Sequence, residues 1–208
     1  AATVYRNYFA EVGGKIGQTF DNQIDCLSSV GDALGNTNDA LWSMSNGYAL
    51  CSPEGLSKIN QRLQSSDESE KDKLRQHLRI GLHSEIEVTD AEAPQNHLIS
   101  QAYCSALPVG YSSSPQTEWA AFANLILESA YEATLCAAIM NCHNRGSNKL
   151  FLTKLGGGVF GNDLQWIYDA MHRAFFLYRD IDLDIRIVSY GSVDPRLEEM
   201  VENWNKSS

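Results

Sequence analysis

A glycine-rich segment, residues 155–162 (LGGGVFGN), contains the residues whose type and spacing best suit a bound ligand. It lies between a short apolar run, 149–154, that predicts a strand and a segment, 163–179, that predicts a helix. Glycine permits positive φ angles and a close approach of the backbone to a ligand, and the free N–H groups at the start of a helix favour an anion. We therefore predict a phosphate-binding loop, with a tight turn that binds nothing as the alternative. The glycines of this loop are Gly156, Gly157, Gly158 and Gly161.

Two nucleotide-binding patterns can be compared with this loop. The Walker pattern is absent, because neither Gly-Lys-Ser nor Gly-Lys-Thr follows the glycines. The dinucleotide pattern G-x-G-x-x-G is matched by Gly156, Gly158 and Gly161, and aspartates follow within 180–184, where a ribose-binding acid is expected. Too few residues come after Gly161 for the βα units that normally succeed this pattern. An NAD-type dinucleotide-binding oxidoreductase therefore stays an alternative and is not the preferred interpretation.

Acidic side chains supply the candidate catalytic groups. Asp32 and Asp39 follow a short apolar run, 24–30 (IDCLSSV), that predicts a buried strand ending in a loop. A carboxylate at the carboxyl end of a strand could stabilise a cation-like transition state or activate water, although such an aspartate also commonly caps a turn or a helix. Glu132 lies in an apolar, helix-like stretch, 118–142, and could act as an acid or a base. A solvent-facing stripe is the alternative for this glutamate.

Strand-like and helix-like segments alternate along the chain. Residues 118–142 repeat apolar side chains every three or four positions without Gly or Pro, which predicts the longest helix. The segments 149–154, 163–179 and 184–189 predict a strand–helix–strand unit. We expect a single α/β domain with three αβα layers, in which a mixed, mostly parallel sheet carries helices on both faces, and an N-terminal extension, 1–20, of undetermined structure. Further predicted strands are 24–30, 84–89 and 97–107, and a helical excursion passes through the charged block 65–73.

The order of elements over residues 149–190 resembles that of the macrodomains, a family that binds ADP-ribose. The loop core Gly158-Val159-Phe160-Gly161 is similar to the Gly-Val-aromatic-Gly of the family's second phosphate loop. Residues 88–111 are similar to the family's central strand, and residues 24–41 occupy the place of its first loop. Within that first loop Ser29-Val30-Gly31-Asp32 replaces the usual Asn-Ala-Ala-Asn, so Asp32 stands where the family has the Asn that contacts the distal ribose. Asn162 follows the second loop, where an aromatic residue is common.

The resemblance implies a function and a set of site residues. It implies that ADP-ribose is bound and that ADP-ribosyl groups are removed from modified protein by hydrolysis, with water as the nucleophile. The loop amides would hold the diphosphate, Phe160 would contact the distal ribose, and Asp21 or Asp25 would receive the adenine amino group. A non-catalytic reader of ADP-ribose is the alternative. The candidate catalytic residues are Asp32, Asp39 and Glu132. The candidate ligand-binding residues are Asp21, Asp25, Gly31, Gly156, Gly157, Gly158, Val159, Phe160, Gly161 and Asn162.

The composition disfavours several other classes of protein. The formal net charge of −10, from 16 Lys and Arg against 26 Asp and Glu, opposes binding of nucleic acid. No apolar run reaches the length of a membrane span, about 20 residues, and no signal-peptide pattern opens the sequence. The 5 cysteines form no Cys-x-x-Cys pair and the 5 histidines lack metal-ligand spacing, so we expect no metal and no cofactor, with ADP-ribose as ligand or product. These features are typical of an intracellular, cytoplasmic protein, and the expected partners are ADP-ribose and ADP-ribosylated protein.

Overall fold

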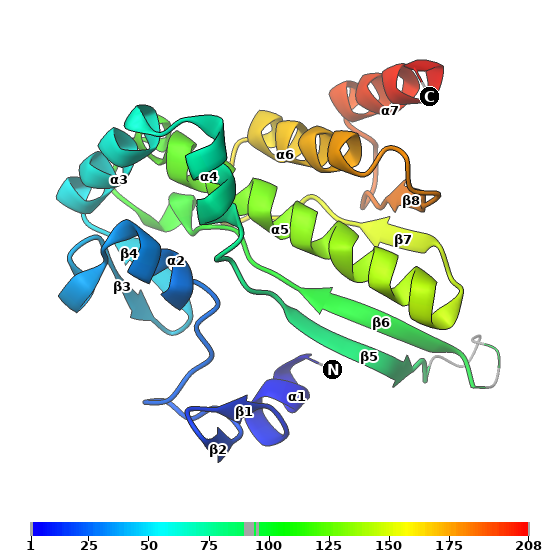
Figure 1. Ribbon diagram of the computed structural model, residues 1–208, viewed down its shortest axis with the longest axis horizontal. Coiled ribbons are helices and arrows are strands. Elements are labelled where there is room, and N and C mark those ends of the chain that lie inside the picture. Colours follow the sequence, from blue (N-terminus) through cyan, green and yellow to red (C-terminus); the bar gives the residue numbers. More distant parts are fainter. Residues whose placement is uncertain (1, 90–93, 95, 208) are drawn as a thin grey trace.

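A computed structural model gives the fold of residues 2–89, 94 and 96–207, which alternate helices and short strands (Figure 1). Residues 90–93 and 95, part of the segment compared above with a central strand, lie outside the described residues. The helices are α1 (Ala2–Tyr8), α2 (Ser28–Leu34), α3 (Pro53–Ser65), α4 (Glu68–Arg75), α5 (Gln116–Arg145), α6 (Leu164–Leu177) and α7 (Pro195–Ser207), with 3₁₀ turns η1 (Thr37–Asp39) and η2 (Val109–Tyr111). The strands are β1 (Glu11–Val12), β2 (Lys15–Ile16), β3 (Trp42–Ser45), β4 (Tyr48–Cys51), β5 (Gly81–Glu87), β6 (Leu98–Tyr103), β7 (Lys149–Leu152) and β8 (Asp184–Ile187). The chain is therefore of the mixed α/β class.

Helix α5 is the longest helix of the described chain and runs through the middle of the molecule (Figure 1). It confirms the helix predicted over 118–142. The helix ends at Gly146, whose φ of +78° forms a left-handed cap and whose amide donates to the carbonyl of Cys142. Helices α3, α4 and α6 and strand β7 pack along α5. Because other elements pack on several sides of α5, its buried apolar residues lie on more than one face of the helix.

The strand–helix–strand unit predicted over 149–189 is confirmed. Strands β7 and β8 are parallel and in register from the pair Lys149 and Asp184 to the pair Leu152 and Ile187. Helix α6 connects them and packs against α5. The glycine-rich segment lies between β7 and α6, at the carboxyl end of a parallel strand, where ligands bind in open α/β folds.

The remaining strands differ from the predicted sheet. The described chain forms four two-stranded sheets, and the pairs β1–β2, β3–β4 and β5–β6 are antiparallel. Strands β3 and β4 are joined by Asn46 and Gly47, which both have positive φ (50° and 81°), as a tight hairpin turn requires. Parallel pairing needs a crossover of a dozen or more residues, which such connections do not provide. A mostly parallel sheet is therefore not confirmed.

The strand predicted over 24–30 is replaced by the approach to helix α2. Leu27 and Val30 are three residues apart, a spacing that fits one face of a helix, and both pack into the core around α3 and α5. One backbone hydrogen bond from the amide of Arg79 to the carbonyl of Cys26 (3.2 Å) joins this segment to the chain just before β5. A short apolar run cannot distinguish a strand from a helix by periodicity, which explains the difference.

Two apolar cores lie along α5. The first surrounds Trp119 and Phe122 near the start of α5 and includes residues of α2, α3 and β3. The second surrounds Leu135 and joins α5 to Ile167 and Met171 of α6 and to β7. Among the residues that the structure describes, no helix has the length and apolar content needed to cross a membrane.

Candidate functional site

The base of the glycine loop is fixed by contacts with residues 106–111. Gly156 has a φ of +76°, and a Cβ at this position would collide with the side chain of Ala106. Gly161 has a φ of +67°, and its Cβ would lie 3.1 Å from the Cα of Gly110. The amide of Gly110 also donates to the carbonyl of Phe160 (2.8 Å). These two glycines are therefore required by the fold itself.

Buried polar groups hold both ends of the loop. The hydroxyl of Tyr131, on α5, donates to the carbonyl of Thr153 (2.8 Å) and accepts from the amide of Leu155 (2.9 Å). At the other end Asn162 is only 4% exposed, and its Nδ2 donates to the carbonyl of Leu107 (2.9 Å). Burial is the main reason that the pKa of Tyr131 is raised, which keeps its hydroxyl protonated as a donor. The side chain of Asn162 therefore fixes the end of the loop by hydrogen bonding and does not lie at the surface.

The tip of the loop differs from its base. Gly157, Gly158 and Val159 are exposed, and the side chain of Val159 is 77% exposed. A Cβ on Gly157 would lie 3.1 Å from the Cδ1 of Ile167, so this position is crowded. A Cβ on Gly158 would meet no atom within 4 Å, and its φ is not in the left-handed region. Gly158 is therefore the one glycine of this loop that neither backbone conformation nor packing requires.

Three aromatic rings meet beside the loop and are named the aromatic trio: Phe160 of the loop, Tyr48 of β4 and Tyr111 of η2. The centroid of the Phe160 ring lies 5.7 Å from Tyr48 and 5.8 Å from Tyr111, and the two tyrosine rings are 5.5 Å apart. All three pairs are edge-to-face, the geometry that aromatic quadrupoles favour. Because all three rings are partly exposed, they form an aromatic wall next to the loop.

The start of α6 is occupied by a carboxylate. Asp163 is the N-cap of the helix, and its Oδ1 accepts from the amide of Gln165 (2.8 Å). A negative side chain in this place satisfies a helix amide and repels a second anion. The amide of Gly157 donates to the carbonyl of Lys154 (3.3 Å), so the tip amides left for an anion are those of Gly158 and Val159.

Asp32 and Asp39 are both exposed. Asp32 lies on α2, and Gly31 before it is buried against the ring of Trp42. Asp39 closes η1 and, with Asn38, has a left-handed backbone (φ 56° and 53°). Neither carboxylate forms a hydrogen bond or an ion pair within the part of the chain that the structure describes. A left-handed non-glycine residue is energetically unfavourable, which singles out Asp39 among the candidate acids.

Asp21 and Asp25, predicted as alternatives for one role, line the same hollow of about 500 Å³. The turn of the β3–β4 hairpin, residues 44–47, forms the opposite wall. Asp21 accepts a hydrogen bond from the hydroxyl of Thr19 (2.7 Å), which lowers the pKa of Asp21. The same hairpin carries Tyr48, so one element contributes both to this hollow and to the aromatic trio.

Glu132 belongs to an ion network that joins α4, α5 and α6. Its carboxylate pairs with Arg173 of α6 (2.7 Å), and Arg173 also pairs with Asp72 of α4 (2.6 Å). Asp72 in turn pairs with Arg75 (2.6 Å), which is buried and also binds Glu68 and Glu128. The members of this ion network are Glu68, Asp72, Arg75, Glu128, Glu132 and Arg173.

The charge of Arg75 is stabilised within this network. Burial opposes the charged form, but the charge and hydrogen bonds of Glu128, with the hydrogen bonds of Asp72 and Glu68, outweigh it and raise the pKa of Arg75. The carboxylate of Glu132 compensates the positive charge of Arg173 in the same network. Glu128 and Glu132 therefore do not form the solvent-facing stripe given as the alternative, because both are partly buried and bind arginines of the neighbouring helices.

Tyr48, Tyr111 and Tyr131 were not among the residues predicted from the sequence. Each lies far along the chain from the glycine loop, and only the fold brings it to Phe160 or to the end of β7. A partial signal was available for Tyr111, because it follows Gly110 in a Pro-Val-Gly-Tyr turn. No group of three or more His, Cys, Asp or Glu among the described residues is arranged to hold a metal ion.

No protein-family model, no curated protein and no solved structure matches this chain.

Proposed function

We propose that the chain is an ADP-ribose-binding domain of the macrodomain kind and that the diphosphate binds at the tip of the glycine loop. Gly158 carries this proposal. Three consecutive glycines raise the entropy of the unfolded chain and so weaken the fold, and Gly158 is the one among them that neither backbone conformation nor packing requires. A close approach of a ligand to the backbone accounts for a glycine at such a position.

The loop and its surroundings offer groups that suit each part of ADP-ribose. Backbone amides at the tip can donate to phosphate oxygens without any Lys or Arg, which is consistent with the negative net charge of the chain. The aromatic trio offers partly exposed rings against which the distal ribose can pack. The hollow beside Asp21 and Asp25 offers carboxylates to the adenine amino group.

The proposal includes a finer arrangement of the fold. In it, β7 and β8 are the parallel part of a sheet in a three-layer αβα domain, and α5 and α6 cover one face of that sheet. The parallel register of β7 and β8 and the packing of α6 on α5 support this arrangement.

Isothermal titration calorimetry with ADP-ribose tests the proposal, with NAD and ATP as comparison ligands. We expect saturable binding of ADP-ribose that is at least about tenfold tighter than that of NAD or ATP, and a rise in melting temperature that follows ligand concentration. Tighter binding of NAD than of ADP-ribose would instead support the dinucleotide-binding oxidoreductase. Absence of binding by all three ligands at millimolar concentration would contradict the proposal.

Hydrolytic removal of ADP-ribosyl groups is the second candidate function, and the left-handed backbone of Asp39 favours it. Unfavourable backbone geometry is retained where a side chain must be held in one position, and active sites are common places for it. In this proposal Asp39 or Asp32 activates water for attack on the anomeric carbon of the distal ribose.

Release of free ADP-ribose from an ADP-ribosylated protein tests this second proposal. We expect turnover by the wild-type chain, loss of turnover in Asp39→Asn or Asp32→Asn with ADP-ribose binding retained, and normal turnover in Asp182→Asn, an exposed aspartate used as the matched control. Binding without release from any linkage assigns the chain as a reader.

A further inference from the structure

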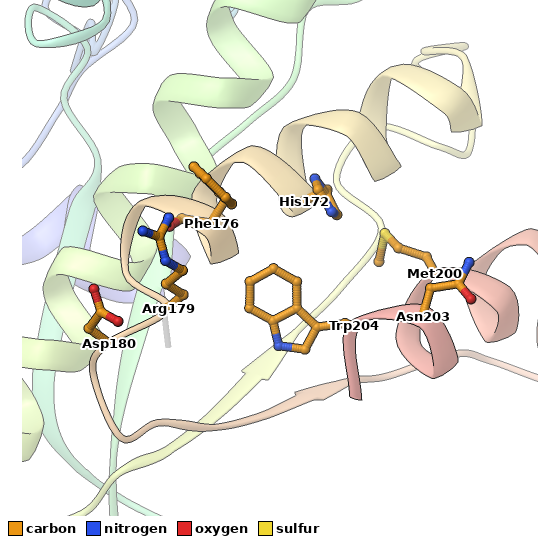
Figure 2. A pocket seen from close by; sticks show the side chains of 7 residues that line it. All are labelled: His172, Phe176, Arg179, Asp180, Met200, Asn203 and Trp204. Atoms are coloured by element: carbon orange, nitrogen blue, oxygen red, sulfur yellow. The ribbon is translucent and has the colours of Figure 1, made fainter. Parts of the chain in front are cut away.

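A second hollow, of about 730 Å³, lies between helices α6 and α7 (Figure 2). Its walls combine aromatic, charged and apolar side chains. Phe176 lies in the last turn of α6, Arg179 and Asp180 lie in the turn that follows it, and Figure 2 shows the indole of Trp204, from α7, between these residues and His172. No residue of the glycine loop, of the aromatic trio or of the ion network lines this hollow.

Aromatic side chains form two sides of this hollow. The Trp204 ring is held by edge-to-face contacts with His172 and Phe175, each with ring centroids 5.8 Å apart. The ring of Phe176 is 55% exposed, and the guanidinium of Arg179 lies 4.3 Å from its centroid. An indole fixed in orientation and a guanidinium already stacked on a ring are the side chains on which planar heterocycles stack.

Two opposite charges at one side of the hollow do not compensate each other. Arg179 and Asp180 are adjacent and exposed, yet in the described part of the chain neither forms an ion pair. Arg179 makes only a long hydrogen bond to the carbonyl of Phe176 (3.4 Å) besides its stacking contact. By contrast, Arg186 pairs with the aspartate two positions before it. Side by side, Arg179 supplies donors and Asp180 supplies acceptors for one edge of a bound ring.

We propose that this hollow binds a guanine base, as a free nucleoside or nucleotide. The Watson–Crick edge of guanine has one acceptor, O6, beside two donors, N1–H and the 2-amino group. Arg179 would donate to O6, and the carboxylate of Asp180 would accept from the two donors, while the base stacks on Trp204. Adenine offers a single donor group on that edge and cannot satisfy a carboxylate in the same way. The net charge of −10 favours a small nucleoside over a nucleic acid chain.

Equilibrium dialysis with labelled guanosine, repeated with inosine and adenosine, tests this proposal. We expect guanosine to bind more tightly than inosine, which lacks the 2-amino group, and adenosine to bind weakest. Asp180→Asn is expected to weaken guanosine binding at least about tenfold, because charge-assisted hydrogen bonds to the carboxylate are lost. Trp204→Leu is expected to abolish binding through the loss of stacking. Circular dichroism checks that each variant folds, and since Asp180 is exposed, its variant tests the site even if Trp204→Leu does not fold.

Matched controls separate this site from other parts of the chain. Phe151→Leu removes another exposed ring that lies near an arginine, Arg186, outside the hollow, and should leave guanosine binding unchanged. Gly158→Ala should also leave it unchanged, so failure of this proposal and failure of the ADP-ribose proposal are distinguishable. Equal affinity for guanosine and adenosine, binding that survives Asp180→Asn undiminished, or no saturable guanosine binding would each overturn the inference.

Discussion

The glycines of the loop have different roles at the scale of single residues. At Gly156 and Gly161 a positive φ coincides with close contacts to residues 106–110, so a side chain there is disfavoured by backbone conformation and by packing. At Gly158 neither constraint is present. The pattern G-x-G-x-x-G requires glycine equally at positions 156, 158 and 161. Only the geometry shows that Gly156 and Gly161 shape the loop, whereas Gly158 leaves room for a ligand.

Gly161→Ala is expected to lower the free energy of unfolding by more than about 1 kcal/mol, because alanine is strained at positive φ and its Cβ would press on Gly110. Urea denaturation monitored by circular dichroism measures this change. Gly146→Ala, at an open left-handed helix cap, is the control: it has the same backbone penalty without the contact and should cost less than Gly161→Ala. A Gly161→Ala variant as stable as the wild type would contradict the account of the loop base.

Cys51 gives a prediction for pH dependence. Burial raises the pKa of the Cys51 thiol to about 12, above the unfolded value of about 8.5. The folded state then retains a proton that the unfolded state loses, so this contribution to stability is complete below about pH 8.5 and decreases as the pH rises toward 12. The difference in unfolding free energy between the wild type and Cys51→Ala should therefore shrink from pH 8 to pH 10. A difference that stays constant over this range would show that the pKa of the Cys51 thiol is not raised in the folded state.

At the scale of secondary structure, the long periodic segments were predictable and the short ones were not. The helix over 118–142 and the unit formed by β7, α6 and β8 carry strong periodicity and clear glycine boundaries, and both are confirmed. The run 24–30 is too short for its periodicity to be decisive, and core packing makes it part of a helical segment. Antiparallel pairing of the early strands follows from close connections, and for β3 and β4 the Asn46-Gly47 turn is a local hairpin signal that the sequence prediction did not use.

The ion network leads to a prediction about how the helices are joined. Glu132→Gln should lower the free energy of unfolding by about 1 kcal/mol, because Arg173 loses a partner that is only partly exposed. ADP-ribose binding should not change. Glu202→Gln is the matched control, since Glu202 pairs with Lys206 at an exposed position on α7 and its substitution should have almost no effect. Equal effects of the two substitutions in a urea titration would show that the network does not stabilise the packing of α5 on α6.

At the scale of the whole molecule, the candidate site is assembled from distant segments. Phe160 lies in the loop, Tyr48 in an early hairpin and Tyr111 just before α5, and no local pattern connects them. The glycine loop and its flanking elements were therefore predictable from the sequence, whereas the aromatic wall beside it was not. The positions of Asp21 and Asp25 around one hollow likewise depend on the β3–β4 hairpin that faces them.

The net charge of the whole chain predicts an unusual salt dependence. ADP-ribose is an anion, and a protein with a formal net charge of −10 repels it at long range. Raising the ionic strength from about 10 mM to 150 mM shortens the screening length from about 30 Å to about 8 Å and should tighten binding, by about twofold. Calorimetric titrations at both ionic strengths measure this change. A marked loss of affinity at the higher salt concentration would mean that side-chain cations, and not backbone amides, hold the diphosphate.

The most direct test of the central claim is the affinity of Gly158→Ala for ADP-ribose, measured by calorimetry together with its stability in urea. We predict that the variant is as stable as the wild type or more stable, by up to about 1 kcal/mol, because alanine fits this position without strain. We also predict that its affinity for ADP-ribose falls at least about tenfold, because the added methyl group occupies the place where the diphosphate approaches the backbone. Unchanged affinity in this stable variant would contradict the assignment of the loop tip as the binding site.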